Sequence, residues 1–94
     1  MIISFKHKGL LKFWSKGDSS KIPSEMVNRI RRILDILNAV TKVPQDFEPF
    51  KNYRLHPLSG DLKGFWSLDV TGNFRILFKF EEGNVYDIDL EDTH

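Results

Sequence analysis

The chain has no cysteine and no long apolar run, and both absences limit what it can be. Without cysteine, neither disulfides nor thiolate metal sites are available. No segment approaches the roughly 18 to 20 apolar residues that a membrane helix requires, and the first six residues become charged too early for a signal peptide. Ninety-four residues leave no room for a second core, so we expect one domain over residues 1–94, located in the cytoplasm.

Several common catalytic signatures are also missing. The three histidines, at positions 7, 56 and 94, are far apart, and neither an HExxH segment nor a Cys/His spacing gives a zinc signature. The segment 60–64 has two glycines but lacks the spacing of a phosphate-binding loop, and no nucleophile elbow is present. The sequence therefore predicts no metal and no cofactor.

Charge is unevenly distributed, although the net charge is only +1. Residues 1–42 contain nine Lys and Arg against three Asp and Glu, whereas residues 43–94 contain five against ten. A basic half joined to an acidic half favours a surface with one side that faces a polyanion. The alternative is that these charges are ordinary solvated helix faces.

The first half of the chain predicts two helices after a short opening strand at residues 2–5. A helix over 8–16 should end at Gly17, which has the position of a C-terminal cap. A second helix should begin near Pro23 or Ser24 and end near Asn38. Its apolar stripe consists of Met26, Ile30, Ile33, Leu34 and Leu37. Arg29 and Arg32 lie off this stripe and should face solvent or a partner; residues 41–53 should form a connecting loop.

The second half predicts an antiparallel meander, because the apolar period changes to two from residue 64 and turns follow at 71–73 and 82–84. The expected apolar face consists of Trp66, Leu68, Val70, Phe74, Ile76, Phe78, Phe80, Tyr86, Ile88 and Leu90. The expected polar face consists of Ser67, Asp69, Arg75, Lys79, Asp87 and Asp89. The two amphipathic helices are the available cover for the apolar face. The fold class is therefore α+β, a two-helix hairpin packed on one face of a small antiparallel sheet.

Four polar residues near the sheet are candidates for chemistry. His56 precedes Pro57, which holds it in extended backbone, although such a histidine is more often structural or simply exposed. Arg75 lies mid-strand, where a cross-strand ion pair is at least as natural a role. Asp92 and His94 alternate on the last segment, where chain ends commonly fray. His7, between two lysines, fits a basic surface.

The residues of several segments resemble the HigB branch of the RelE/ParE toxins, long labelled plasmid maintenance system killer proteins. The resemblance covers essentially the whole chain and rests on SFKHKGL at 4–10, RLHPLSGD at 54–61, GFWS at 64–67, NFRI at 73–76 and EDTH at 91–94. It implies two helices on a small antiparallel sheet, in agreement with the periodicity. It also implies a toxin that cleaves messenger RNA in the ribosomal A site and is neutralised by a helix-turn-helix antitoxin.

Matched by motif, the RNase centre would consist of His56, Arg75, Asp92 and His94. We expect metal-independent attack of a ribose 2′-OH on the adjacent phosphate, with the histidines transferring protons, Arg75 on the phosphate and Asp92 orienting His94 or the 2′-OH. The sequence does not show which of the two histidines is the general acid and which is the general base. The expected contacts to RNA and ribosome are Lys6, Lys8, Lys12, Arg29, Arg31, Arg32, Lys63 and Lys79.

Two departures from the family pattern stand out. Thr93 occupies a position where members often have Tyr, and Ser59 one where some have Lys. These changes put the rate and the codon preference in question more than the class of activity. Two other functions remain open: a ParE-like toxin that binds and poisons a topoisomerase, and a degenerate toxin retained for binding its antitoxin. The histidine pair with Arg75 favours the RNase, because topoisomerase binding gives these residues no role.

Overall fold

A computed structural model describes residues 1–93 of the chain; His94, one of the expected catalytic residues, lies outside this range. Helix α1 spans Lys8–Lys16, a short 3₁₀ turn η1 spans Ser24–Met26, and helix α2 spans Val27–Ala39. Both helices are thus found where the sequence predicted them. Gly17 ends α1 with a left-handed φ of 72°, a conformation that glycine adopts without steric cost.

Helix α1 begins at a histidine cap. The Nδ1 atom of His7 accepts a hydrogen bond of 3.0 Å from the backbone N–H of Leu10, which satisfies one of the free donors of the first turn. The expectation that His7 belongs simply to a basic surface is therefore incomplete, because its ring has a structural role.

The sheet contains four strands in the order β1-β2-β3-β4, all antiparallel. Their bounds are His56–Pro57 for β1, Trp66–Asp69 for β2, Phe74–Glu81 for β3 and Asn84–Asp92 for β4. The segment expected as an opening strand runs parallel to β4 but makes only two isolated bridges, Ile2 to Val85 and Phe5 to Ile88.

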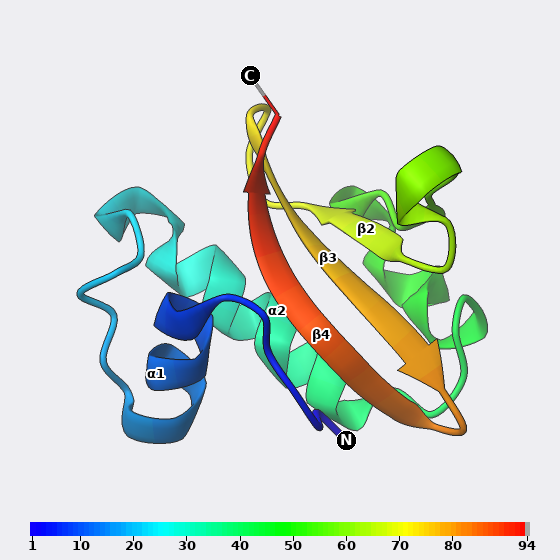
Figure 1. Cartoon of the computed structure of the whole chain (residues 1–94), viewed down its shortest axis with the longest axis horizontal. Helices are drawn as coiled ribbons and strands as arrows, with labels where there is room; N and C mark the ends of the chain where they lie inside the picture. Colours follow the sequence, from blue (N-terminus) through cyan, green and yellow to red (C-terminus); the bar gives the residue numbers. More distant parts are fainter. Residues whose placement is uncertain (94) are drawn as a thin grey trace.

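The core lies between the helices and one face of the sheet. Figure 1 shows α1 and α2 on the same side of the sheet, with α2 behind β3 and β4. The whole predicted stripe of α2 is buried, from Met26 to Leu37. It packs in one cluster with buried residues of β2, β3 and β4, namely Leu68, Ile76, Phe78, Val85 and Ile88. The predicted fold class is confirmed.

Residues 41–53 are not the plain loop that the sequence suggested. A 3₁₀ segment, η2, spans Gln45–Tyr53 and is kinked at Phe50. Phe47, Phe50 and Tyr53 recur every third residue, and all three pack in or against the apolar core. Phe47 and Tyr53 are buried, and Phe47 stacks on Phe78 with ring centroids 6.2 Å apart.

A β-bulge in β4 alters the predicted alternation. Leu77 pairs with Asp89 but Lys79 pairs with Tyr86, so two residues of β4 oppose Phe78. Asp87, one of those two, has a left-handed φ of 55°. Before the bulge the faces are therefore reversed from the prediction: Val85 is buried, and Tyr86 shares the face of Lys79.

Candidate active site

We call the face of the sheet turned away from α2 the outer face. Two adjacent cross-strand rows of this face contain candidate residues. From β1 to β4, the first row consists of His56, Ser67, Leu77 and Asp89. From β2 to β4, the second row consists of Asp69, Arg75 and Glu91. His56 and Arg75 are two strands apart and in adjacent rows, which places their Cα atoms about 12 Å apart, so two long side chains on this face can contact one phosphodiester group and its neighbouring ribose.

His56 is exposed, and its ring orientation is defined by one hydrogen bond. Its Nδ1 atom lies 2.9 Å from the backbone carbonyl oxygen of Arg54. Because a carbonyl can only accept, Nδ1 must donate, and in the neutral ring the lone pair is then on Nε2. An imidazole held in this tautomer can take a proton through Nε2.

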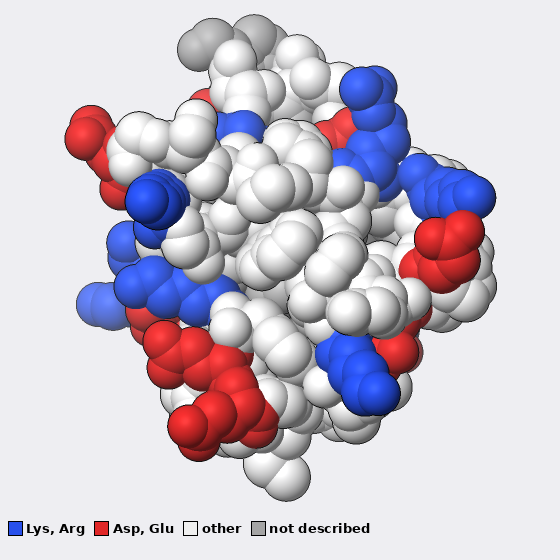
Figure 2. Space-filling view, turned by 90° about the vertical axis from the view of Figure 1, so that its right-hand side faces the viewer, with Lys and Arg blue, Asp and Glu red and all other residues white. Residues whose placement is uncertain are grey.

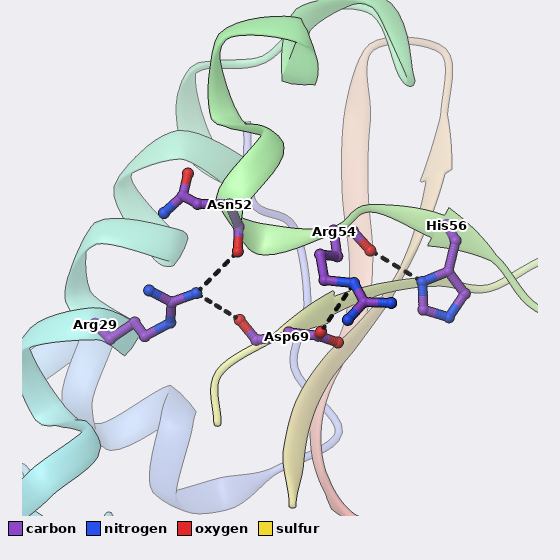
Figure 3. Close-up of polar contacts among 5 residues, drawn as sticks. All are labelled: Arg29, Asn52, Arg54, His56 and Asp69. Atoms are coloured by element: carbon purple, nitrogen blue, oxygen red, sulfur yellow. Dashed lines mark hydrogen bonds and ion pairs between the residues drawn. The ribbon is translucent and has the colours of Figure 1, made fainter. Parts of the chain in front are cut away.

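A set of polar contacts connects α2 to the backbone next to His56 (Figure 3). Arg29 Nη2 donates to the carbonyl oxygens of Asn52, at 3.2 Å, and Asp69, at 3.3 Å. The carboxylate of Asp69 lies 3.7 Å from Nε of Arg54, which has a left-handed backbone with φ 53°. In Figure 3, Arg29 and His56 lie at opposite ends of this set. The contacts fix the end of η2, from which the chain enters β1.

Arg29 was expected to face solvent or a partner, but its guanidinium binds carbonyl groups of the same chain. Its side chain is half-buried, and its guanidinium carbon lies 4.5 Å from the centroid of the Tyr53 ring. Its Nε atom is buried without a hydrogen-bond partner in the described part of the chain. Sequence periodicity placed Arg29 off the apolar stripe of α2 correctly, but η2 and the end of β2 cover that position.

Arg75 makes the cross-strand ion pair that its position allowed, and its partner is Glu91. Its Nε and Nη2 atoms both donate to Oε1 of Glu91, the former over 2.8 Å. The Arg75 side chain is 24% exposed and that of Glu91 34% exposed. The guanidinium is therefore accessible at the outer face, with its plane held by a carboxylate.

Asp92 is exposed and pairs with Phe74, one position beyond the pair of Arg75 and Glu91. Strand alternation therefore assigns it to the face opposite that of Arg75 at this level of the sheet. Thr93 donates both its N–H and its hydroxyl to the carbonyl of Asn73, over 2.6 and 2.9 Å. The structure thus brings His56 and Arg75 to one face, does not place Asp92 there, and does not describe His94.

Most of the expected RNA-contacting cations are exposed. They are Lys6, Lys8, Lys12, Arg31, Arg32 and Lys63, while Lys79 is half-buried. Arg31 lies over the ring of Phe13, 5.1 Å from its centroid. Figure 2 shows the side of the molecule that includes β2: an uncharged central area has Lys and Arg at its borders, mixed with Asp and Glu. On this side the basic groups form separate patches.

Two residues of the site were not identified from the sequence. Glu91 was missed because counting back from the 82–84 turn pairs Arg75 with Leu90; the bulge inserts one residue and places Glu91 there instead. Arg54 was missed because its contribution is a backbone carbonyl. The available signal was its position, two residues before the candidate histidine His56.

Within residues 1–93, no three His, Asp or Glu side chains lie close enough together to hold a metal ion. The same residues include no helix long and apolar enough to cross a membrane.

Comparison with known proteins places this geometry in a family. Residues 3–94 match the family described as "RelE-like toxin of type II toxin-antitoxin system HigB". Over 94 residues, which is all of both chains, the sequence is 42% identical to "Endoribonuclease HigB" of Proteus vulgaris. It is 32% identical over 84 residues to "Toxin HigB-1" of Vibrio cholerae, covering 88% of this chain and 87% of that one.

Among solved structures, YafQ of E. coli superposes with a TM-score of 0.61 at 15% identity, over 98% of this chain and 91% of that one. A likeness at this identity establishes the fold, and it agrees with two helices packed on a four-stranded antiparallel sheet. The family match and the curated relatives extend over nearly the whole length. The chain therefore belongs to the HigB family of RelE-like toxins of type II toxin–antitoxin systems.

Proposed function

We propose that the protein is an endoribonuclease toxin that cleaves messenger RNA on the ribosome, in the cytoplasm, by attack of a ribose 2′-OH on the adjacent phosphate. The observation that supports this most strongly is the exposed His56, whose Nδ1 is held by the Arg54 carbonyl while Nε2 is left for proton transfer. A relative with 42% identity that is named an endoribonuclease supports the same activity.

In the proposed reaction, Nε2 of His56 takes the proton of the 2′-OH as this oxygen forms a bond to phosphorus. The bond between phosphorus and the 5′ oxygen of the next nucleotide breaks, and that oxygen receives a proton from a general acid. The products are a 2′,3′-cyclic phosphate and a 5′-hydroxyl. A positioned proton-transfer group contributes roughly 10²- to 10⁴-fold in rate, so removal of the His56 imidazole should cost a loss in that range.

Arg75 would stabilise the negative charge that develops on the phosphate oxygens. Its two recorded hydrogen bonds go through Nε and Nη2 to one oxygen of Glu91. A guanidinium has five N–H donors in one plane, so it can bind a phosphate while Glu91 holds one edge. Glu91 thus orients the fork before substrate arrives, which avoids ordering a flexible side chain during the reaction.

For the general acid we keep His94, with Asp92 orienting it. His94 follows Asp92 by two residues in the sequence and lies outside the residues that the structure describes. Thr93, where relatives often have an aromatic residue, bonds to Asn73 rather than presenting a ring. We expect this change to affect the rate and the codon preference, because a threonine cannot stack on a base.

Dependence on the ribosome follows from how open the outer face is. His56 is exposed at the sheet edge and Arg75 is 24% exposed, so water has access to both. A ribosome that orients the message and excludes water would supply what the fold lacks. The exposed Lys8, Lys12, Arg31 and Arg32 on the helices would contact ribosomal RNA, so binding should weaken steeply with salt.

The partner in the cell would be a helix-turn-helix antitoxin that forms a stable complex with this chain. The toxin must dock on the ribosome to act. An antitoxin bound elsewhere on this chain can therefore neutralise it by blocking that approach sterically, without covering His56.

The direct test uses programmed ribosomes whose message contains one 2′-deoxynucleotide at the cleaved position. The protein should cut the all-ribose message to a 2′,3′-cyclic phosphate and leave the deoxy message intact. It should also cut the same naked oligonucleotide much more slowly. Cleavage of the deoxy message at the parent rate would contradict the 2′-OH mechanism, and equal rates on naked RNA would contradict ribosome dependence.

A further inference from the structure

An aromatic ring on the outer face is flanked by two lysines. Phe65 is half-buried, and the ammonium nitrogens of Lys6 and Lys79 lie 5.8 and 4.9 Å from the centroid of its ring. The three residues come from different parts of the chain: the segment before α1, the residue before β2, and β3. Folding therefore assembles a hydrophobic ring and two cations in one place.

This cluster lies next to the candidate active site. Phe65 precedes Ser67 by two residues, and Ser67 pairs with His56 across the sheet. The Phe65 carbonyl also accepts a hydrogen bond of 2.9 Å from the N–H of Leu58, two residues after His56. From strand spacings, the Cα atoms of Phe65 and His56 are about 8 Å apart. One nucleotide and its neighbour can therefore contact both residues.

The lysines are not tied to the protein by strong interactions. Lys6 is exposed, and Lys79 makes an ion pair of 3.9 Å with Asp87 in which both side chains are 42% exposed. Exposed ion pairs and cation–π contacts of this kind contribute little stability. Both ammonium groups can therefore leave the ring and bind a polyanion without a large cost to the fold.

A half-buried ring and two cations beside it match the two parts of a nucleotide, its base and its phosphate. Bases stack on aromatic side chains through their π-face, and lysines neutralise the phosphates on either side. Stacking accepts any base, so such a site determines where the strand lies rather than which sequence is bound. A ring used only for folding would be expected on the core face, where Trp66 and Phe78 lie.

We propose that Phe65, Lys6 and Lys79 form a nucleotide-binding subsite in which the Phe65 ring stacks on one base of the message beside the cleaved phosphodiester. Lys6 and Lys79 bind the phosphates on either side of that nucleotide. Phe65 is a positioning residue: it holds the strand so that the 2′-OH lies near Nε2 of His56. The inference rests on the proposed RNase function and names a further part of the same site.

The test is a double-mutant cycle between protein and message, measured as single-turnover cleavage on programmed ribosomes. Phe65→Leu keeps an apolar side chain but removes the π-face, and an abasic site in the message removes one base at a time. Stacking on one base contributes about 1–3 kcal/mol, so Phe65→Leu should slow cleavage of the intact message roughly 5- to 150-fold. At one abasic position the two losses should not add, because both remove the same contact.

Phe65→Trp should retain or improve cleavage, since a larger ring stacks at least as well. Phe50→Leu is the matched control, because Phe50 is a half-buried ring on η2 that contacts Phe47 rather than the outer face. Thermal unfolding of each variant separates a folding defect from a positioning defect. Lys6→Gln and Lys79→Gln should each lower the salt dependence of ribosome-bound cleavage by about one unit of the log–log slope.

The result that would overturn the subsite is a folded Phe65→Leu variant that cleaves like Phe50→Leu, or losses that add at every abasic position. His56→Gln distinguishes this failure from failure of the proposed function. If His56→Gln abolishes cleavage while Phe65→Leu does not slow it, the RNase mechanism stands and the stacking site is rejected. If the parent does not cleave the programmed message, both are rejected.

Discussion

The two faces of the sheet differ in what their residues contact. On the face toward the helices, Leu68, Ile76 and Phe78 are fully buried and belong to one apolar cluster with α2. On the outer face, His56 is exposed and the Arg75 side chain is 24% exposed. The proposed reaction therefore uses the face opposite the one that stabilises the fold, so neighbouring residues of β3 should respond to mutation in different ways.

The division is incomplete in the middle of the outer face. Ser67 is fully buried and Leu77 is 3% exposed, although both share a row with His56. The hydroxyl of Ser67 has no hydrogen-bond partner within the described residues. Ser67 and Leu77 are thus buried beside the candidate catalytic groups, and their close packing holds the side chains around them in place.

The largest effect on folding should come from the core face. Ile76→Ala removes a fully buried side chain, and such truncations typically lower the free energy of unfolding by about 2–5 kcal/mol. Leu11→Ala is the matched control, because Leu11 is 46% exposed and should change stability little. Chemical denaturation measures both. Cleavage by the fraction of Ile76→Ala that remains folded should equal that of the parent; a lower rate per folded molecule would break the separation between the two faces.

Local sequence patterns predicted α1, α2 and strands β2 to β4, but not the 3₁₀ segment η2. The 3.6-residue stripe of α2 and the glycine after Lys16 predicted both helices, since these signals depend only on nearby residues. The period of two predicted the strands and the face that α2 covers. Family motifs singled out His56 and Arg75 as candidates, and the pairing of strands brings them to one face.

Features determined by distant contacts were predicted poorly. The bulge at Asp87 changes which residues of β4 are buried, and it arises from how β3 and β4 pair rather than from a pattern in the chain. Ser67 was expected on an open polar face because alternation cannot report what covers that face. Arg29 was expected to face solvent or a partner, because the carbonyls that it binds, of Asn52 and Asp69, are 23 and 40 residues away in the sequence.

A smaller effect on the free energy of unfolding should distinguish Arg29 from Arg32, both on α2. Arg29→Met keeps a hydrophobic stem on Tyr53 but leaves the carbonyls of Asn52 and Asp69 without their donor, which should cost about 1–3 kcal/mol. Arg32→Met alters an exposed side chain and should stay within about 0.5 kcal/mol of the parent. Urea denaturation compares them. Equal stabilities would mean that the Arg29 contacts do not support the fold.

The smallest effect on stability should appear at acidic pH. Hydrogen bonds from the backbone N–H groups of Thr41 and Lys42 lower the pKa of Asp46 from its ordinary value of 3.8. Its contribution to stability is therefore complete above the unfolded-state pKa and is lost as the pH falls through the folded-state pKa. Asp46→Asn should flatten the pH dependence of unfolding below about pH 4. An unchanged acid limb in thermal melts would contradict this role.

We expect His56 to transfer a proton in the reaction while contributing little to folding. The most direct measurement is single-turnover cleavage on programmed ribosomes by His56→Gln, with His7→Asn as the control that removes the other described imidazole but keeps a capping side chain. We predict a loss of roughly 10²- to 10⁴-fold for His56→Gln, an unchanged melting temperature, and near-parent cleavage by His7→Asn. Cleavage by a folded His56→Gln within a few-fold of the parent would show that His56 does not transfer the proton.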